Sequence, residues 1–324
     1  MSNRFVYPIV KDREGGIWIG TFYGGVNYLS PNTGQFECFA HSRFSNSVNG
    51  TVIGRFCEDT YGHIWIASDD GGFSCFSPKD KHFTHYLPDE HRNSLSYHNV
   101  HALCMDGDDL WIGTYTGGVN VLNTKTGVFR IYTTKAGDPT TLDRSSSYAI
   151  FKDREARIWV TSMSGVNLYN REEDNFTRIR DLGSWIMDID QDADGNIWFS
   201  SQGNGLFKYD PDKQEWTNYV HSSAPGALIN DKVNCVLIDG NGEMWIGTMN
   251  GLCKYNAKED QFELIPFDIP SRNICAIIED QRVLWLTTTK GLVRYVPGES
   301  CHVFTRSDGL QSEQFLVNAA LKAS

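Results

Sequence analysis

Short apolar segments alternate with polar turns along the whole chain. Four such segments form a unit that recurs, each rich in Val, Ile, Tyr, Phe and Trp and bounded by Gly, Pro, Asn and Asp. This pattern is typical of antiparallel strands joined by tight turns. No stretch keeps its apolar residues at the 3.6-residue period of an amphipathic helix, so we expect almost no helix.

The turn between the first and second segments is the clearest repeated phrase. Asp59–Ser68 reads DTYGHIWIAS, the end of one strand, a turn and the start of the next. An Asp at this point can accept hydrogen bonds from its own turn, and a Gly three residues later supplies a positive φ. Similar phrases begin at Asp12, Asp106, Asp153, Asp192, Asp239 and Asp280, and the Asp106 copy is one residue shorter.

Each copy carries one tryptophan, and the seven tryptophans fall 47, 46, 48, 39, 47 and 40 residues apart. A period in this range indicates a repeat architecture such as a propeller. A lone four-stranded sheet cannot bury both of its apolar faces, whereas seven sheets arranged radially bury each face against a neighbour. We therefore predict an all-β, seven-bladed propeller with four-stranded antiparallel blades and its tryptophans between blades. The tryptophans concerned are Trp18, Trp65, Trp111, Trp159, Trp198, Trp245 and Trp285.

The predicted propeller covers residues 1–307, and residues 308–324 resemble the start of another unit. We expect this last stretch to be a tail that leads to a following unit, or that pairs with an exposed strand edge. Because the chain starts inside a strand pattern and stops in an apolar stretch, we expect an excised piece of a longer protein.

The charge and composition of the chain exclude some classes of function. The 324 residues include 29 Lys and Arg against 40 Asp and Glu, a net charge of −11, so a nucleic-acid partner is not expected. No run of about 18 apolar residues could span a bilayer. The eight cysteines lie in strand patterns without a CxxC pair, which favours small buried side chains over disulfides.

The full pattern resembles the two-component regulator propeller repeat. It reads as a strand, D-x-x-G-x-I-W-I-G-T, two residues, G-G-V, a strand, a turn and F-x-x-Y, and it recurs in phase from Phe5 to Leu321. The phrases at residues 93–96 and 139–142 resemble the family's connection into the first strand. The copies centred on Trp159, Trp198 and Trp285 depart from it, because the double glycine is lost.

The resemblance implies a role. Such repeats form the extracytoplasmic sensor region of Bacteroides-type hybrid histidine kinases, which commonly detect glycan fragments. It implies a periplasmic ligand-sensing fragment whose partners are an oligosaccharide or other small molecule, other domains of the parent sensor and a possible homodimer. No cofactor is implied, and the kinase activity would lie outside this chain.

In a propeller, ligands usually bind at one mouth of the central channel. Connections into the first strands and turns between the second and third strands line that mouth, and their non-glycine residues vary between copies. Aromatic faces can stack on sugars while Arg, Asn and Asp reach hydroxyl groups, although ordinary loop packing is the alternative for each residue. The candidates are Tyr23, Arg55, Asp69, Asp70, His98, His101, Tyr115, Tyr148, Trp185, Lys232, Asn234, Arg272 and Asn273.

Enzyme and metal signals are weaker. His82 and His85 lie three apart on a strand and so face opposite sides, which argues against a shared metal. Asp192–Asn196 resembles half of a calcium loop but coincides with the repeated turn and lacks the final Glu. We therefore expect no metal and no catalysis in this fragment. A protein-interaction scaffold is the alternative to ligand sensing, and a propeller lyase or hydrolase is a weaker one.

Overall fold

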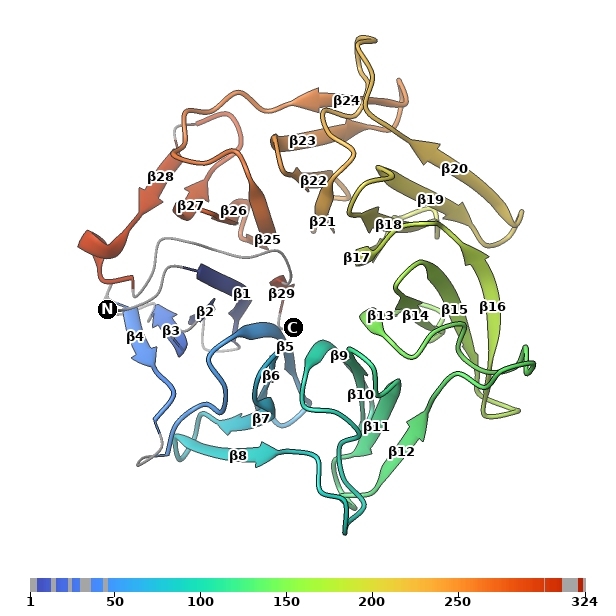
Figure 1. The fold of residues 1–324 in the computed structure, drawn as a ribbon. Helices are drawn as coiled ribbons and strands as arrows, with labels where there is room; N and C mark the ends of the chain where they lie inside the picture. Colours follow the sequence, from blue (N-terminus) through green and yellow to red (C-terminus); the bar gives the residue numbers. More distant parts are fainter. Residues whose placement is uncertain are drawn as a thin grey trace.

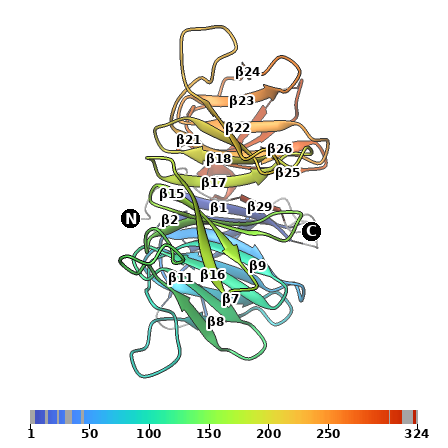
Figure 2. The same cartoon turned by 90° about the vertical axis from the view of Figure 1, so that its right-hand side faces the viewer.

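The structure is a seven-bladed β-propeller, as the repeats predict. It is a computed structural model that describes residues 5–12, 16–22, 25–29, 36–42, 46–299, 301–310 and 320–322. Seven sheets, each with four antiparallel strands, surround a central channel, and a fifth strand joins the first sheet (Figure 1). Seen from the side, the ring is flatter than it is wide (Figure 2). In the described residues the only helix is the short 3-10 turn η1, Arg306–Asp308.

Blades 1 to 7 take four consecutive strands each, numbered from the channel outward. Blade 1 has β1 (Phe5–Lys11), β2 (Ile17–Phe22), β3 (Gly25–Leu29) and β4 (Phe36–Phe39). Blade 2 has β5 (Ile53–Glu58), β6 (Ile64–Ser68), β7 (Gly72–Ser77) and β8 (His82–Tyr86). Blade 3 has β9 (Val100–Asp106), β10 (Asp109–Thr114), β11 (Val119–Asn123) and β12 (Phe129–Tyr132). Blade 4 has β13 (Ser147–Lys152), β14 (Ile158–Ser162), β15 (Gly165–Asn170) and β16 (Asn175–Asp181).

Blade 5 has β17 (Ile186–Gln191), β18 (Ile197–Ser201), β19 (Leu206–Asp210) and β20 (Glu215–Tyr219). Blade 6 has β21 (Val233–Ile238), β22 (Met244–Thr248), β23 (Gly251–Asn256) and β24 (Gln261–Leu264). Blade 7 has β25 (Ile274–Asp280), β26 (Val283–Thr288), β27 (Gly291–Tyr295) and β28 (Cys301–Phe304). Each inner strand contacts the next around the ring, and β25 contacts β1, so the circle closes.

The hydrophobic core consists of layers between neighbouring blades. Trp111 of blade 3 packs with Ile158 and Val160 of blade 4, and Trp198 of blade 5 packs with Met244 of blade 6. The other five repeat tryptophans lie in equivalent inter-blade clusters. The prediction that these tryptophans are core residues is confirmed. Each contributes roughly 200 Å² of aromatic surface to a blade interface.

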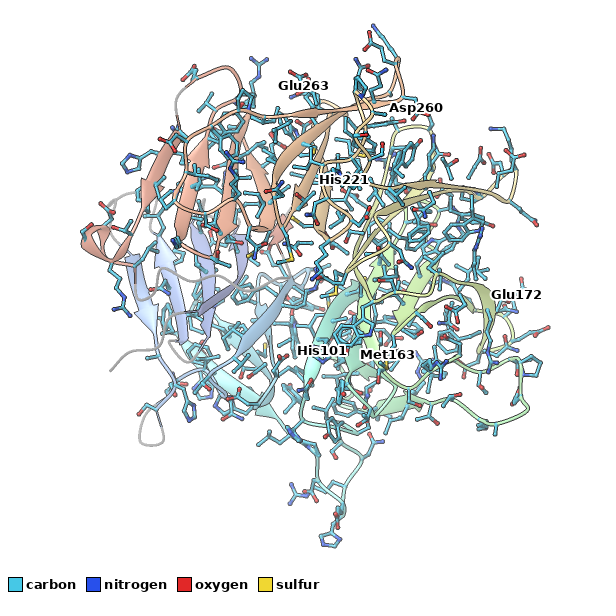
Figure 3. All side chains as sticks on the ribbon, turned by 45° about the horizontal axis from the view of Figure 1, so that its top comes forward. His101, Met163, Glu172, His221, Asp260 and Glu263 are labelled. Atoms are coloured by element: carbon cyan, nitrogen blue, oxygen red, sulfur yellow. The ribbon has the colours of Figure 1, made fainter. Side chains whose placement is uncertain are left out.

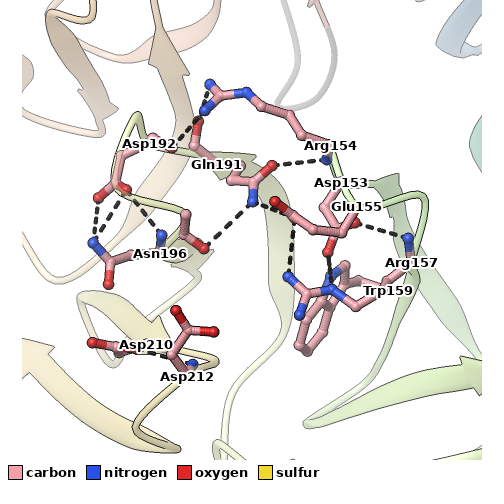
Figure 4. Close-up of polar contacts among 11 residues, drawn as sticks. Asp153, Arg154, Glu155, Arg157, Trp159, Gln191, Asp192, Asn196, Asp210 and Asp212 are labelled. Atoms are coloured by element: carbon pink, nitrogen blue, oxygen red, sulfur yellow. Dashed lines mark hydrogen bonds and ion pairs between the residues drawn. The ribbon is translucent and has the colours of Figure 1, made fainter.

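The repeated Asp holds the tryptophan of its own blade. In blade 5 the Asp192 carboxylate accepts hydrogen bonds from the Asn196 backbone N–H at 2.9 Å and from the Trp198 indole N–H at 2.7 Å. Blade 4 repeats this geometry, with the Trp159 indole 2.8 Å from Asp153 (Figure 4). A polar indole group can thus be buried without losing its hydrogen bond. Blades 1, 2 and 6 have the same link, at 2.7, 3.1 and 2.9 Å.

Blades 3 and 7 have a shorter turn, and there the Asp has a different partner. Asp106 lies five residues before Trp111 instead of six, and the Trp111 indole nitrogen is buried without a partner. Asp106 instead forms an ion pair with Lys152 of blade 4 at 3.0 Å. Asp280 in blade 7 likewise pairs with Lys11 of blade 1. Where the turn is one residue shorter, the Asp therefore forms an ion pair with the next blade instead of a hydrogen bond with the tryptophan of its own blade.

The chain after β28 crosses back toward blade 1. Leu310 is buried between blades 7 and 1, in the same cluster as Ile9 and Trp285. Residues 320–322 form β29 (Ala320–Lys322), which pairs in parallel with the inner edge of β1. That residues 308–324 lead into a following unit stays a prediction.

The described cysteines form no disulfide, which agrees with the interpretation as small buried side chains. The side chain of Cys38 lies outside the described residues. The seven free cysteines are buried or half-buried: Cys57, Cys75, Cys104, Cys235, Cys253, Cys275 and Cys301.

Candidate functional site

One mouth of the channel gathers most of the candidate residues. The connections into the inner strands meet the turns between second and third strands there, and backbone hydrogen bonds join the two. The Tyr115 N–H donates to the Asn99 carbonyl at 3.1 Å, and the Gln202 N–H donates to the Trp185 carbonyl at 2.9 Å. These bonds fix the loops that carry the side chains.

Four ring side chains form a continuous row on blades 3, 4 and 5, which we call the aromatic wall (His101, Tyr115, Tyr148 and Trp185). Tyr148 lies between His101 and Trp185, with ring centroids 4.7 Å and 5.4 Å away and planes tilted by 26° and 13°. Tyr115 meets His101 edge-on at 6.0 Å. Figure 3 shows His101 at the inner end of its blade, beside the channel.

The wall has buried and exposed parts. Tyr148 is 5% exposed, whereas Tyr115 is 42% and Trp185 is 47% exposed. A fixed aromatic surface with an open face suits a flat, partly apolar ligand, since little conformational entropy remains to be lost on binding. This is the feature of the mouth with the clearest binding chemistry.

Asp69 and His101 make a polar contact at the foot of the wall. The Asp69 carboxylate lies 3.3 Å from His101 Nδ1. Burial raises the pKa of Asp69 to about 7, with the nearby Asp70 charge adding to it. Burial also lowers the pKa of His101 to about 4, and the positive charge of Arg55 acts in the same direction. At neutral pH the imidazole is therefore uncharged, and its Nε2 is buried without a hydrogen-bond partner in the described residues.

Arg55 crosses the channel below this contact. It comes from β5 in blade 2, and its Nη2 donates to the Met187 carbonyl of blade 5 at 2.5 Å. Its Nη1 lies 3.3 Å from Asp188, whose other oxygen accepts the Val236 N–H of blade 6 at 3.2 Å. Arg55, Asp188 and Asp190 line a channel cavity of about 290 Å³. Arg55 thus links blades across the channel, and its guanidinium is occupied within the protein.

The mouth continues over blades 6 and 7 with polar and basic groups. Asn234 is fully buried, donates to Asn273 Oδ1 at 2.8 Å and to the Ile274 carbonyl at 2.6 Å, and accepts from Gln202 Nε2 at 2.7 Å. Its hydrogen-bonding groups are used within the protein, so it serves as a support. Lys232 and Arg272, in contrast, are exposed.

The remaining candidates are separate from the wall. Asp70 accepts from the Thr51 N–H at 2.8 Å and from the Ser68 hydroxyl at 2.6 Å, which holds its own loop. His98 is exposed and lies against Tyr97, with ring centroids 4.6 Å apart. Tyr23 lies outside the described residues.

Sequence reasoning missed the two channel carboxylates, Asp188 and Asp190. Burial raises the pKa of Asp190 to about 7 and also raises the pKa of Asp188. The sequence did contain a signal for them. The inner strand of blade 5, IMDIDQ, has two Asp residues where the inner strand of blade 6, VNCVLI, has Cys and Leu. The calcium-loop alternative at Asp192–Asn196 is a turn, as expected, since the Asp192 carboxylate faces its own N–H donors.

Two further results concern absence within the described part of the chain. No group of three or more His, Cys, Asp or Glu side chains there is arranged to hold a metal ion. Nor does any helix in those residues have the length and apolar character to cross a bilayer.

The comparison with known families agrees with this architecture. The sequence profile of the two-component regulator propeller matches residues 1–23, 94–116 and 227–250. The chain contains two-component regulator propeller repeats. The matched segments cover the first two strands of blade 1, and the connection and first two strands of blades 3 and 6.

Proteins that are similar to this chain in sequence or in fold have different described roles. Histidine kinase P4 of Formosa agariphila is 24% identical over 180 residues, 52% of this chain but only 13% of that protein. The extracellular domain of a protein described as a one-component system of B. thetaiotaomicron has a TM-score of 0.55 at 14% identity, covering 93% of this chain and 52% of that one. Virginiamycin B lyase of Staphylococcus aureus has a TM-score of 0.69 at 15% identity, covering 87% and 91%. At these identities the solved structures show a shared fold alone, which regulators and enzymes both use.

Proposed function

We propose that this propeller is the ligand-sensing part of a transmembrane hybrid two-component sensor, that it lies in the periplasm, and that it binds an oligosaccharide at the channel mouth. The aromatic wall is the observation that carries the ligand proposal. The regulator repeats and the partial match to a histidine kinase support the signalling context. Binding would control the kinase and, through it, transcription.

The chemistry of the wall fits a sugar. The less polar faces of pyranose rings stack on aromatic side chains, and Trp185 and Tyr115 offer such faces to solvent. A polar group next to the wall, the Asp69 carboxylate at its foot, can reach hydroxyl groups. A site with an apolar floor and a few convergent polar groups is the usual form of a small-ligand site.

The scaffold alternative has less support. Exposed apolar side chains on or next to the outer strands, such as Leu87, Ile131 and Val220, are spread over blades 2, 3 and 5. A protein-binding surface is expected to present such side chains as one contiguous patch.

Isothermal titration calorimetry with a panel of plant and host oligosaccharides tests the proposal, with thermal unfolding as a first screen. A ligand at a hundredfold excess over its Kd stabilises the fold by about 2.7 kcal/mol, which shifts the melting temperature measurably. Trp185→Ala should weaken binding about tenfold or more, because one stacked face is lost. Tyr61→Ala is the matched control, since Tyr61 is 62% exposed but lies in the turn between β5 and β6 at the opposite mouth. Equal effects of the two variants, or no binder in the panel, would count against the proposal.

A further inference from the structure

Three positively charged side chains lie on the part of the mouth that continues from the aromatic wall. Lys232 precedes β21, Arg272 precedes β25, and Lys290 lies in the turn between β26 and β27. We call these three residues the basic rim. Within the described part of the chain, none of them lies within ion-pair distance of a carboxylate, whereas Lys152, Lys213 and Lys254 all do.

Hydrogen bonds connect the basic rim to Trp185 through one rigid belt. Gln202 donates its backbone N–H to the Trp185 carbonyl, forms a β-bridge with Lys232, and donates its side-chain amide to Asn234. Asn234 donates to Asn273, the neighbour of Arg272. The hydroxyl groups of Ser271 and Thr289, which flank Arg272 and Lys290, are 2.6 Å apart. The fold therefore holds the rim in a fixed relation to the exposed tryptophan.

Arg272 also lines a pocket next to the rim. The pocket has a volume of about 450 Å³, within the usual range of roughly 300–1,000 Å³ for small-ligand sites. Its other walls include Asn250, Pro266, Phe267 and Asp268. An apolar ring face, an amide and a guanidinium thus meet in one recess beside the mouth.

The charge balance of this area is positive, although the chain as a whole carries −11. The acids nearest in sequence are Asp231 and Asp268. Asp231 accepts the His221 N–H at 2.6 Å, and Asp268 is exposed in the pocket. Three cations against these two carboxylates leave a formal charge of +1. None of the three cations is held in an ion pair, so this local excess of positive charge on an otherwise acidic protein attracts an anion to the mouth.

We propose that the ligand of this mouth is an acidic oligosaccharide, with a sugar ring on Trp185 and a carboxylate or sulfate group at the basic rim. This inference rests on the proposed function. Arg272 can hold either group with two parallel hydrogen bonds, and the two lysines add point charges. The distinguishing feature is that neutral glycans use only the wall, whereas acidic glycans use the wall and the rim.

The test compares matched ligands by calorimetry on the full chain. Oligogalacturonate is paired with its fully methyl-esterified form, and a sulfated heparin-derived oligosaccharide is paired with its desulfated form. In at least one pair, the acidic member should bind about tenfold more tightly at 50 mM salt, and the advantage should shrink at 500 mM as the charges are screened. Comparison of the two pairs distinguishes a carboxylate from a sulfate ligand.

Variants then locate the anion. The triple variant Lys232→Gln, Arg272→Gln and Lys290→Gln should remove the preference for the acidic member and leave binding of the neutral member unchanged. The control triple, Lys79→Gln, Lys213→Gln and Lys258→Gln, removes three charges from the turns between third and fourth strands at the opposite end, and should keep the preference. Melting temperatures verify that both triples are folded.

Each outcome has one meaning. If a neutral member binds as tightly as its acidic partner in both pairs, the acidic-ligand inference is overturned while the proposed function stands. An unchanged preference in the rim variant, or an equal loss in the control triple, also overturns it. If neither member of any pair binds, and the wider panel also lacks a binder, the proposed function itself fails.

Discussion

Asp192→Ala tests how much the repeated Asp–Trp link contributes to the stability of a blade. The carboxylate of Asp192 accepts the Trp198 indole N–H at 2.7 Å and the backbone N–H groups of Asp194 and Asn196 at 3.0 and 2.9 Å. Trp198 is fully buried, so its indole nitrogen loses its acceptor inside a blade interface. The substitution keeps the backbone and the tryptophan, and it removes these bonds together with those from the Asn196 side-chain amide at 2.9 and 3.1 Å.

The expected cost follows from the donors that are left without a partner. A buried donor that loses its acceptor costs about 1–3 kcal/mol, and here the indole and the Asn196 N–H both lie inside the turn. The Asp194 N–H is at the surface and regains water. We therefore expect a loss of about 2–4 kcal/mol, and a melting temperature lower by about 4–16 °C, given roughly 2–4 °C per kcal/mol for large domains. The variant should still fold, because blade 3 already tolerates an unpartnered Trp111 indole.

Urea unfolding followed by tryptophan fluorescence measures the difference. Asp194→Ala is the matched control: it removes the same charge from the same turn, but Asp194 is exposed, so we expect a change within about 0.5 kcal/mol. If Asp192→Ala is no more destabilising than Asp194→Ala, the carboxylate makes no net contribution and the account of the repeated Asp is wrong.

Three further predictions follow from the channel and the core. Burial raises the pKa of Asp69 from 3.8 to about 7, so between these pH values the folded state holds a proton that the unfolded chain has lost, and stability falls as pH rises through that window. Asp69→Asn should flatten this part of the stability profile in urea unfolding at pH 5 and pH 7.5, and an unchanged slope would contradict it. Arg55→Ala leaves Asp188, whose side chain is 21% exposed, without its cation, and should cost at most about 3–5 kcal/mol. The double variant with Asp188→Asn should lose less than the sum of the single losses, and strictly additive losses would refute the coupling. Burial raises the pKa of the Cys104 and Cys253 thiols to about 12, so a thiol reagent at pH 8 should modify them only in denaturant. Mass spectrometry maps the labelled cysteines, and rapid labelling of either one in the native protein would disprove this.

The number of blades and the place of each tryptophan could be predicted from the sequence, because both follow from local periodicity. A strand rich in β-branched and aromatic residues needs only its neighbours in sequence to form a hairpin, and seven copies in phase leave one way to bury all the faces. The mouth residues could be predicted for the same reason. His101, Tyr148 and Trp185 lie 10, 11 and 13 residues before the tryptophans of their own blades, at or just before the start of an inner strand, so the repeat brings them to one end of the channel.

Which side chains from different blades pair with one another depended on the tertiary structure. Arg55 and Asp188 are 133 residues apart, and only closure of the ring brings blade 2 opposite blade 5. Similarly, a turn that is one residue shorter directs Asp106 toward Lys152 of the next blade, a partner that no spacing within the repeat identifies. The raised pKa of Asp69 and the lowered pKa of His101 come from burial among several blades. The repeated pattern determines the fold of each blade. Contacts across the channel depend on residues that differ between blades, and these residues meet only when the ring is closed.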